Sequence, residues 1–238
     1  MITPVNRIMT GLIGLAFVAI ASVKASPVTV EELGMKAGAY QVVGIHSTTT
    51  DGWSFSGDVY AGVIKLDVNG TPMQGFCIDP WHLSAPGVLD YDLRTLALAP
   101  AWPGPMGSAA AAEIEKLWSH YYSAGIDADT AAALQIEIWK ITDAAVADGT
   151  FQLTSASGTI LAKMGLMEAW LGGDISGAPA AWLSAVVSME TDGAVARPPR
   201  KLGQDYVIPG VPDGGWTVAL VGLGLLGLCL ARRRATGV

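Results

Sequence analysis

Two long hydrophobic runs lie at the ends of the chain and differ from everything between them. The first covers residues 8–23, follows a short segment with one basic residue, and is followed by small residues. This order is typical of a secretory signal peptide, with candidate cleavage sites after Ala21 and after Ala25. An uncleaved N-terminal anchor is the alternative. We therefore expect residues 1–25 to be a signal peptide.

The second run covers residues 216–231 and is followed by the cluster Arg232, Arg233 and Arg234. As a helix it would be about 24 Å long, close to the roughly 30 Å of a bilayer core. Trp216 and the snorkelling arginines can cover the difference. The pattern predicts a single C-terminal membrane helix with its arginines in the cytoplasm and the preceding domain outside.

Between these ends, alternating apolar and polar residues predict strands over 39–45, 58–67 and 71–79, with a polar loop over 47–57. Asn69-Gly70 is a strong signal for a two-residue hairpin turn between the last two strands. Such a turn fixes a register that pairs Val68 with Thr71, Ile64 with Gly75, and Gly62 with Cys77.

Helical periodicity follows a proline-punctuated, loop-like segment over 80–105. It predicts helices over about 108–123, from Asp127 or Asp129 to about 147, over 157–171, and a shorter one over 179–189. Residues 191–210 show no periodicity and are interpreted as a linker. The prediction is one α+β domain over 26–190, with an N-terminal antiparallel sheet of hairpins packed on three to four C-terminal helices.

One glutamine interrupts the apolar stripe of the predicted helix over 127–147. At 100° per residue, Gln135 falls beside Ile138 and Trp139, whereas the opposite face carries Glu137, Lys140, Asp143 and Asp148. A buried carboxamide without partners costs about 1–3 kcal/mol. Gln135 therefore needs either hydrogen bonds to a neighbouring backbone or a chemical role.

The cysteine count singles out another residue. The chain has two cysteines, Cys77 and Cys229, and Cys229 lies in the predicted membrane helix. An exported domain would then hold one cysteine in an oxidising compartment, where cysteines usually come in pairs. Cys77 is therefore expected to be buried, dimerised or chemically committed.

The C-terminus resembles the PEP-CTERM class of sorting signals, most closely its VPDSG variant. The resemblance rests on a short motif, a membrane helix and the arginine cluster, in that order within residues 211–238. The motif residues are Val211, Pro212, Asp213, Gly214 and Gly215. A glycine stands at position 214 where the variant has serine. The resemblance implies processing by an exosortase and a final place at the cell surface or in an exopolysaccharide matrix.

The central segment resembles the thioester domains of bacterial surface proteins. The resemblance rests on Phe76-Cys77-Ile78-Asp79 and on Gln135-Ile136-Glu137-Ile138-Trp139. It implies a bond between the Cys77 sulfur and the Gln135 side chain with loss of ammonia, Asp79 as a nearby acid, and Phe76 and Trp139 as supporting residues. The sequence departs from the family at Leu134, where threonine is frequent, and at Glu137, where a small residue is common.

These features favour an exported adhesion or matrix protein that attaches covalently to surface amines or hydroxyl groups. The alternatives are a matrix protein of the same fold without the bond, and a cysteine hydrolase that uses Cys77 with His82 or His120. Residues 1–25 and 216–238 together hold five of the 14 basic residues and none of the 21 acidic ones, so the rest of the chain has a net charge near −12. No basic block remains to neutralise phosphates, so nucleic-acid binding is disfavoured. The three histidines show no metal-ligand spacing, and no cofactor is expected.

Overall fold

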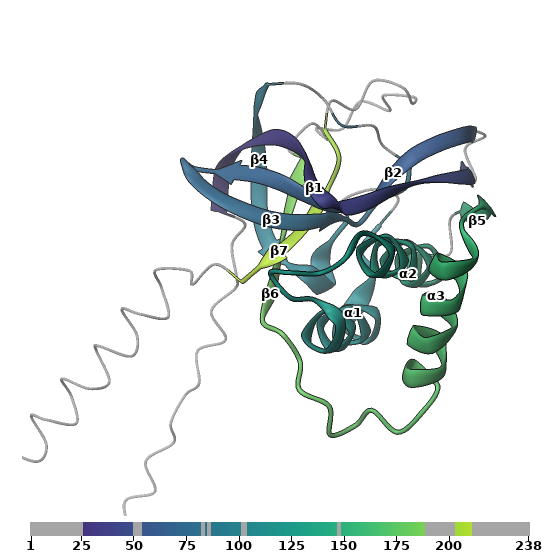
Figure 1. Cartoon of the computed structure of the whole chain (residues 1–238). Helices are drawn as coiled ribbons and strands as arrows, with labels where there is room; N and C mark the ends of the chain where they lie inside the picture. The colour runs from purple at the N-terminus through teal and green to yellow at the C-terminus, as the bar shows by residue number, and fades with distance from the viewer. Residues whose placement is uncertain are drawn as a thin grey trace, which may run out of the picture.

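The computed structural model describes residues 26–49, 54–81, 84, 87–100, 104–146, 149–188 and 203–210. In this part of the chain, antiparallel strands form one layer and helices pack against it, so the predicted α+β class is confirmed (Figure 1). The predicted signal peptide and the sorting segment lie outside the described residues.

A hairpin of β2 (Ser54–Val68) and β3 (Thr71–Cys77) forms as the Asn69-Gly70 signal predicts. Asn69 and Gly70 both have positive φ, at 52° and 79°, as a tight hairpin turn requires. Val68 pairs with Thr71 and Ile64 with Gly75, so this part of the register is confirmed.

The predicted pairing of Gly62 with Cys77 is wrong. Gly62 pairs with Tyr40 of β1 (Ser26–Thr49), and its φ is +147°. A Cβ atom at this position would lie 2.3 Å from the Ala39 carbonyl oxygen. The glycine therefore allows the close approach of β1 at a register shift.

The strands close into a ring. Along the 7-stranded sheet the order is β2-β3-β7-β6-β4-β1-β5, and β1 also pairs with β2. β1 begins 13 residues before the predicted 39–45 strand, and its N-terminal end pairs with β4 (Val88–Thr95). Its C-terminal end pairs with β5 (Gly149–Ser155), which the helical interpretation of the surrounding sequence did not predict.

Two predictions near the end of the domain are wrong. The expected helix over 179–189 is β6 (Leu183–Ser188), and the expected linker over 191–210 contains β7 (Tyr206–Pro209). All six residues of β6 are buried, including Ser184 and Ser188, so the strand lacks the alternation of apolar and polar residues that marks a half-exposed strand. β7 lies between β3 and β6 and completes the ring.

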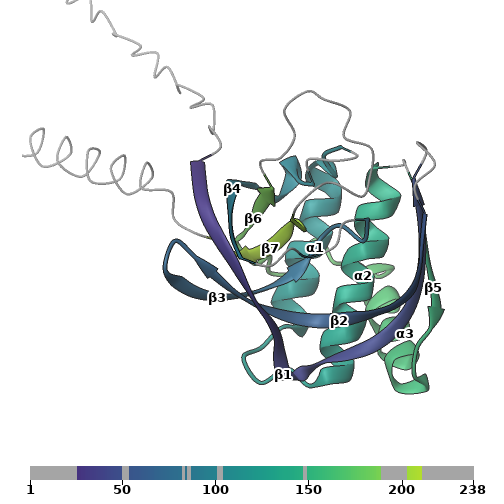
Figure 2. The same ribbon diagram turned by 90° about the horizontal axis from the view of Figure 1, so that it is seen from above.

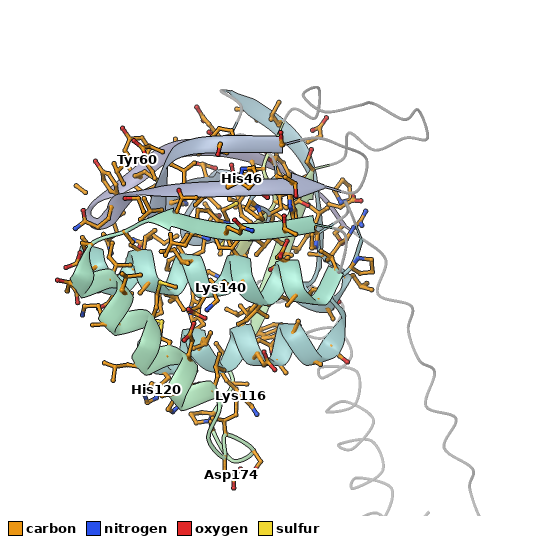
Figure 3. The ribbon with its side chains drawn as sticks, turned by 90° about the vertical axis from the view of Figure 1, so that its right-hand side faces the viewer. His46, Tyr60, Lys116, His120, Lys140 and Asp174 are labelled. Carbon is orange, nitrogen blue, oxygen red and sulfur yellow. The ribbon has the colours of Figure 1, made fainter. Side chains whose placement is uncertain are left out.

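The helices α1 (Gly107–Tyr121), α2 (Ala128–Val146) and α3 (Gly158–Leu171) form where the periodicity predicts them. Asp127 accepts a hydrogen bond from the Thr130 N–H at the start of α2, and Ser157 accepts one from Ile160 at the start of α3. β1 and β2 cross over α2 (Figure 2), and α2 lies between the strands and α1 (Figure 3). The central position of α2 brings its residues against the end of β3.

Candidate functional site

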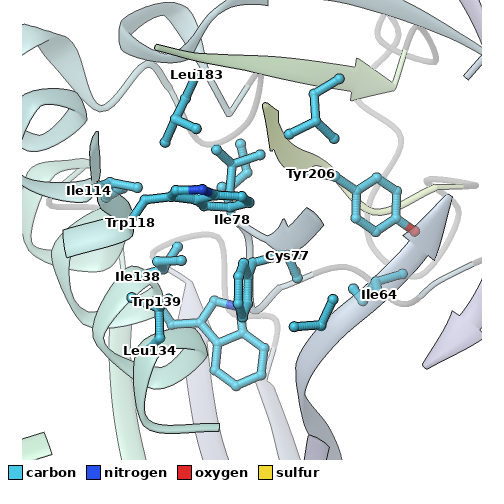
Figure 4. Close-up of a cluster of buried hydrophobic side chains, with 14 of the residues drawn as sticks. Ile64, Cys77, Ile78, Ile114, Trp118, Leu134, Ile138, Trp139, Leu183 and Tyr206 are labelled. Atoms are coloured by element: carbon cyan, nitrogen blue, oxygen red, sulfur yellow. The ribbon is translucent and has the colours of Figure 1, made fainter. Parts of the chain in front are cut away.

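Cys77 is the last residue of β3 and lies in the interior of the domain. Its side chain is 1% exposed and is surrounded by hydrophobic side chains from the helices and the sheet (Figure 4). The preceding residue, Phe76, packs edge-to-face against Trp118 and Tyr122, with ring centroids 5.2 and 5.9 Å apart. These contacts anchor the end of β3 on α1.

The Gln135 side chain of α2 pairs with the main chain of Cys77. The Cys77 N–H donates to Gln135 Oε1 over 3.0 Å, and Gln135 Nε2 donates to the Cys77 carbonyl oxygen over 2.7 Å. Gln135 is only 1% exposed, so both hydrogen bonds are shielded from water. The structure therefore brings together the two residues, 58 positions apart, that the sequence singled out.

The sulfur of Cys77 has its own neighbours. Its thiol donates to the main-chain carbonyl oxygen of Asp79 over 3.0 Å. Burial raises the pKa of the thiol well above its ordinary value, and the negative charge of Asp79 raises it further, whereas Trp139 acts in the opposite direction. The Trp139 indole N–H is buried without a hydrogen bond of ordinary geometry among the described residues. The neutral thiol is consequently the stable form.

Asp79 fixes the end of β3 to β7. Its carboxylate accepts a hydrogen bond from the Asp205 N–H over 3.1 Å, and the Asp205 main-chain oxygen accepts one from the Ile78 N–H over 3.0 Å. The Asp205 carboxylate in turn accepts from the Ser188 N–H of β6 over 2.8 Å. Sequence reasoning missed Asp205 because it lies in the expected linker, and nothing local marks it as a buried residue.

A cavity of about 390 Å³ extends along one side of the site. Its lining includes the buried Cys77 and Trp139 together with Tyr60, which is 62% exposed, and the exposed Ser84. Exposed and buried residues thus share its wall, and Cys77 lies on the buried side of the cavity. No sequence signal predicted this cavity.

Glu32 of β1 also lines this cavity, and it was not singled out by the sequence. Its carboxylate Oε2 accepts a hydrogen bond of 2.7 Å from the Tyr206 hydroxyl. Tyr206 is the residue of β7 that pairs with Cys77. The carboxylate is thus attached to the strand that lies beside the cysteine.

The prediction that Glu137 lies on a polar face of its helix is wrong, because Glu137 is only 2% exposed. α1 and α3 pack on the side of α2 that faces away from the sheet, so the middle of α2 is buried on all sides. Lys140 forms ion pairs with Glu137 and with Glu168 of α3 and so partners the buried carboxylate.

His120 of α1, which the sequence suggested as a partner for Cys77, has other contacts. His120 is exposed and stacks on Trp170 of α3, with ring centroids 4.6 Å apart and planes at 18°. His82, the other candidate, lies outside the described residues.

When the chain is compared with known protein families, its C-terminal end gives a match. Residues 210–235 match the VPDSG-CTERM motif. This span includes the motif residues and the arginine cluster that carried the predicted resemblance. The motif indicates an exported protein that is processed by an exosortase and reaches the cell surface. Among the described residues, no helix is long and apolar enough to cross a membrane; the predicted membrane helix lies outside them.

No curated protein and no solved structure matches the chain. The match to the VPDSG-CTERM motif does not extend to Cys77 or Gln135. The resemblance to thioester domains therefore rests on the residues themselves and on the contact between them.

Proposed function

We propose that this VPDSG-CTERM protein carries an internal thioester between Cys77 Sγ and Gln135 Cδ, and that it attaches covalently to surface nucleophiles through this bond. The observation that carries the proposal is the double hydrogen bond between the Gln135 carboxamide and the Cys77 main chain. Cδ is bonded to both atoms that make these contacts, so it is held beside the residue whose sulfur would attack. Positioning of this kind is the main requirement of an intramolecular acyl transfer.

The hydrogen bonds also suit the electronic demands of the reaction. The Cys77 N–H donates to Oε1, the atom on which negative charge develops when sulfur adds to the carboxamide. Nε2, which leaves, is held by the Cys77 carbonyl oxygen. The S–C bond forms as the C–N bond breaks, and the thiol proton leaves with the nitrogen as ammonia.

The surroundings favour a bond that persists until a nucleophile arrives. Cys77 is buried among hydrophobic side chains, which limits hydrolysis by water. The cavity shared with Tyr60 and Ser84 gives an amine or hydroxyl group a route from the surface. Attack on Cδ would join the nucleophile to the Gln135 side chain and return the proton to sulfur.

The mass of the intact mature protein tests this proposal. We expect it to be lower by one ammonia than the mass calculated from the sequence, and to increase by one methylamine after treatment with that amine. Cys77→Ala and Gln135→Ala should abolish both changes. Gln152→Ala, at an exposed glutamine of β5, is the matched control and should retain them. A wild-type mass equal to the calculated value would contradict the proposal.

A second function is favoured by the same hydrogen bonds. They satisfy the Gln135 carboxamide and both main-chain groups of Cys77 without any covalent bond, as a structural matrix protein would require. Thiol labelling under denaturing conditions distinguishes the two functions. Immediate labelling of Cys77 in untreated protein supports the matrix protein, whereas labelling only after amine treatment supports the thioester.

A cysteine hydrolase is supported less well by the site. Such an enzyme needs a thiolate near neutral pH, but burial raises the pKa of Cys77. In addition, the His120 ring stacks on Trp170 of α3. Both observations favour the two non-enzymatic functions.

A further inference from the structure

The cavity beside Cys77 has a charged group in its wall. Among the described residues that line it, Glu32 is the charged one, and the others are apolar or neutral polar side chains and glycine. A carboxylate in a mostly apolar cavity attracts a cationic group and offers an acceptor for a proton. A hydroxyl nucleophile is attracted less strongly by this carboxylate, because it carries no positive charge.

Two features of the fold hold the Glu32 carboxylate in place. Glu32 immediately precedes a shift in the register between β1 and β2, where a strand bends and redirects its side chains. The Tyr206 hydroxyl then donates to Oε2 over 2.7 Å. Burial raises the pKa of Tyr206, so its hydroxyl stays protonated and remains a donor.

Tyr206 also links this carboxylate to the cysteine. It pairs with Cys77 in the ladder between β3 and β7, and Figure 4 shows its ring near Cys77 and Ile64. Glu32 and Cys77 therefore line one cavity, and their positions are fixed through the same tyrosine. A nucleophile in the cavity would have the acyl group on one side and a carboxylate on another.

We propose that Glu32 is the proton acceptor for the amine that opens the thioester, and that it makes primary amines the preferred nucleophiles of this site. This inference rests on the proposed Cys77–Gln135 bond. The amine nitrogen adds to Cδ and the C–S bond breaks, which leaves an amide on the Gln135 side chain. Glu32 takes one proton from the nitrogen and passes it to the departing Cys77 sulfur, which restores both the carboxylate and the thiol.

The experiment compares two nucleophiles on the full-length protein. The wild type, Glu32→Gln and Glu31→Gln are treated with methylamine or hydroxylamine, and the increase in intact mass is followed with time. Glu31→Gln is the matched control, because Glu31 is the neighbouring strand residue and does not line the cavity. Before treatment, an intact mass lower by one ammonia than the calculated mass shows that a variant has folded and formed its thioester.

We expect Glu32→Gln to slow the reaction with methylamine by about 10²-fold, the lower end of the range for a positioned proton acceptor. The reaction with hydroxylamine should slow much less, because its addition intermediate loses a proton to water readily. Glu31→Gln should react like the wild type with both. Glu32→Asp, which keeps the acceptor one methylene further away, should recover part of the methylamine rate.

Three results would overturn the role of Glu32 and leave the thioester intact. The first is a Glu32→Gln variant that forms the thioester and still reacts with methylamine at the wild-type rate. The second is a Glu32→Gln variant whose reactions with methylamine and hydroxylamine slow equally. The third is a Glu32→Asp variant that recovers none of the lost methylamine rate. Equal slowing would show that the substitution only alters the shape of the cavity. Absence of the ammonia loss in the wild type would instead overturn the thioester, and the role of Glu32 with it.

Discussion

Gln135 matches its surroundings at the level of individual atoms. The main chain of Cys77 presents one donor and one acceptor to α2, and a carboxamide has the complementary acceptor and donor. A glutamate would lack the donor, and an asparagine would be one methylene shorter. The residue is thus specified by hydrogen bonding whether or not the covalent bond forms, and the ammonia loss is what separates these two roles.

Glu137 is a second residue whose chemistry depends on its neighbours. Burial raises the pKa of its carboxyl above the ordinary value of 4.5, while Lys140 acts in the opposite direction. The folded state therefore holds this proton to higher pH than the unfolded state does. The contribution of the group to the free energy of unfolding falls as the pH rises from about 4.5 through the raised folded pKa.

Glu137→Gln should flatten this dependence. We expect the wild type to lose more stability than the variant as the pH rises across that window, because the amide never has to be charged in the interior. Denaturant unfolding at a series of pH values measures the difference, with Glu113→Gln on the exposed surface of α1 as the matched substitution. A stability difference that is independent of pH between the two proteins would contradict the expectation.

At the scale of elements, the contact between β3 and β7 determines the geometry around Cys77. Phe76 pairs with Val207 and Cys77 with Tyr206, and Asp79 and Asp205 extend the connection beyond the ladder. Gly75 lies at the start of this contact. A Cβ atom on Gly75 would be 2.4 Å from the Val207 carbonyl oxygen, so only glycine permits β7 to approach this closely.

Gly75→Ala should therefore push β7 away from β3 and destabilise the domain by about 1–3 kcal/mol, the usual cost of overpacking. Gly165→Ala is the control, because Gly165 lies in α3 with open space around it. Alanine there should stabilise the protein by about 0.5–1 kcal/mol through helix propensity. Unfolding in denaturant gives the free energy of unfolding of both variants and of the wild type. Equal values for Gly75→Ala and the wild type would refute the tight contact between β3 and β7.

At the scale of the whole molecule, the ring of strands is closed by the element nearest to the sorting signal. β7 ends at Pro209, and the match to the VPDSG-CTERM motif begins at residue 210. The last strand of the domain and the signal that directs its processing are thus adjacent in the chain. The ring cannot be complete until this C-terminal segment is available to pair with β3 and β6.

Truncation on either side of β7 tests this arrangement. A chain of residues 26–210 should unfold cooperatively, because it retains every described strand and helix. A chain of residues 26–188 should lose cooperative unfolding, since β3 and β6 would then expose unpaired main-chain groups. Circular dichroism during heating follows both transitions. Equal midpoints for the two chains would show that β7 is dispensable.

The elements that could be predicted from the sequence are those specified by neighbouring residues. Asn69 and Gly70 adopt the positive φ that a tight turn needs, and the three helices follow a local period with Asp127 and Ser157 as caps. The C-terminal motif is likewise a local pattern. These signals were sufficient for the α+β class, the hairpin and the sorting signal.

The sequence by itself also indicated Cys77 and Gln135 as a pair, but only the tertiary structure decided how they meet and what surrounds them. The all-buried run of β6 has no period, and β7 is a strand only because β3 and β6 offer hydrogen bonds on both sides. The burial of Glu137 and the place of Glu32 in the cavity wall depend in the same way on elements distant in the chain. Local patterns determine which elements form, whereas non-local packing determines which side chains share a site.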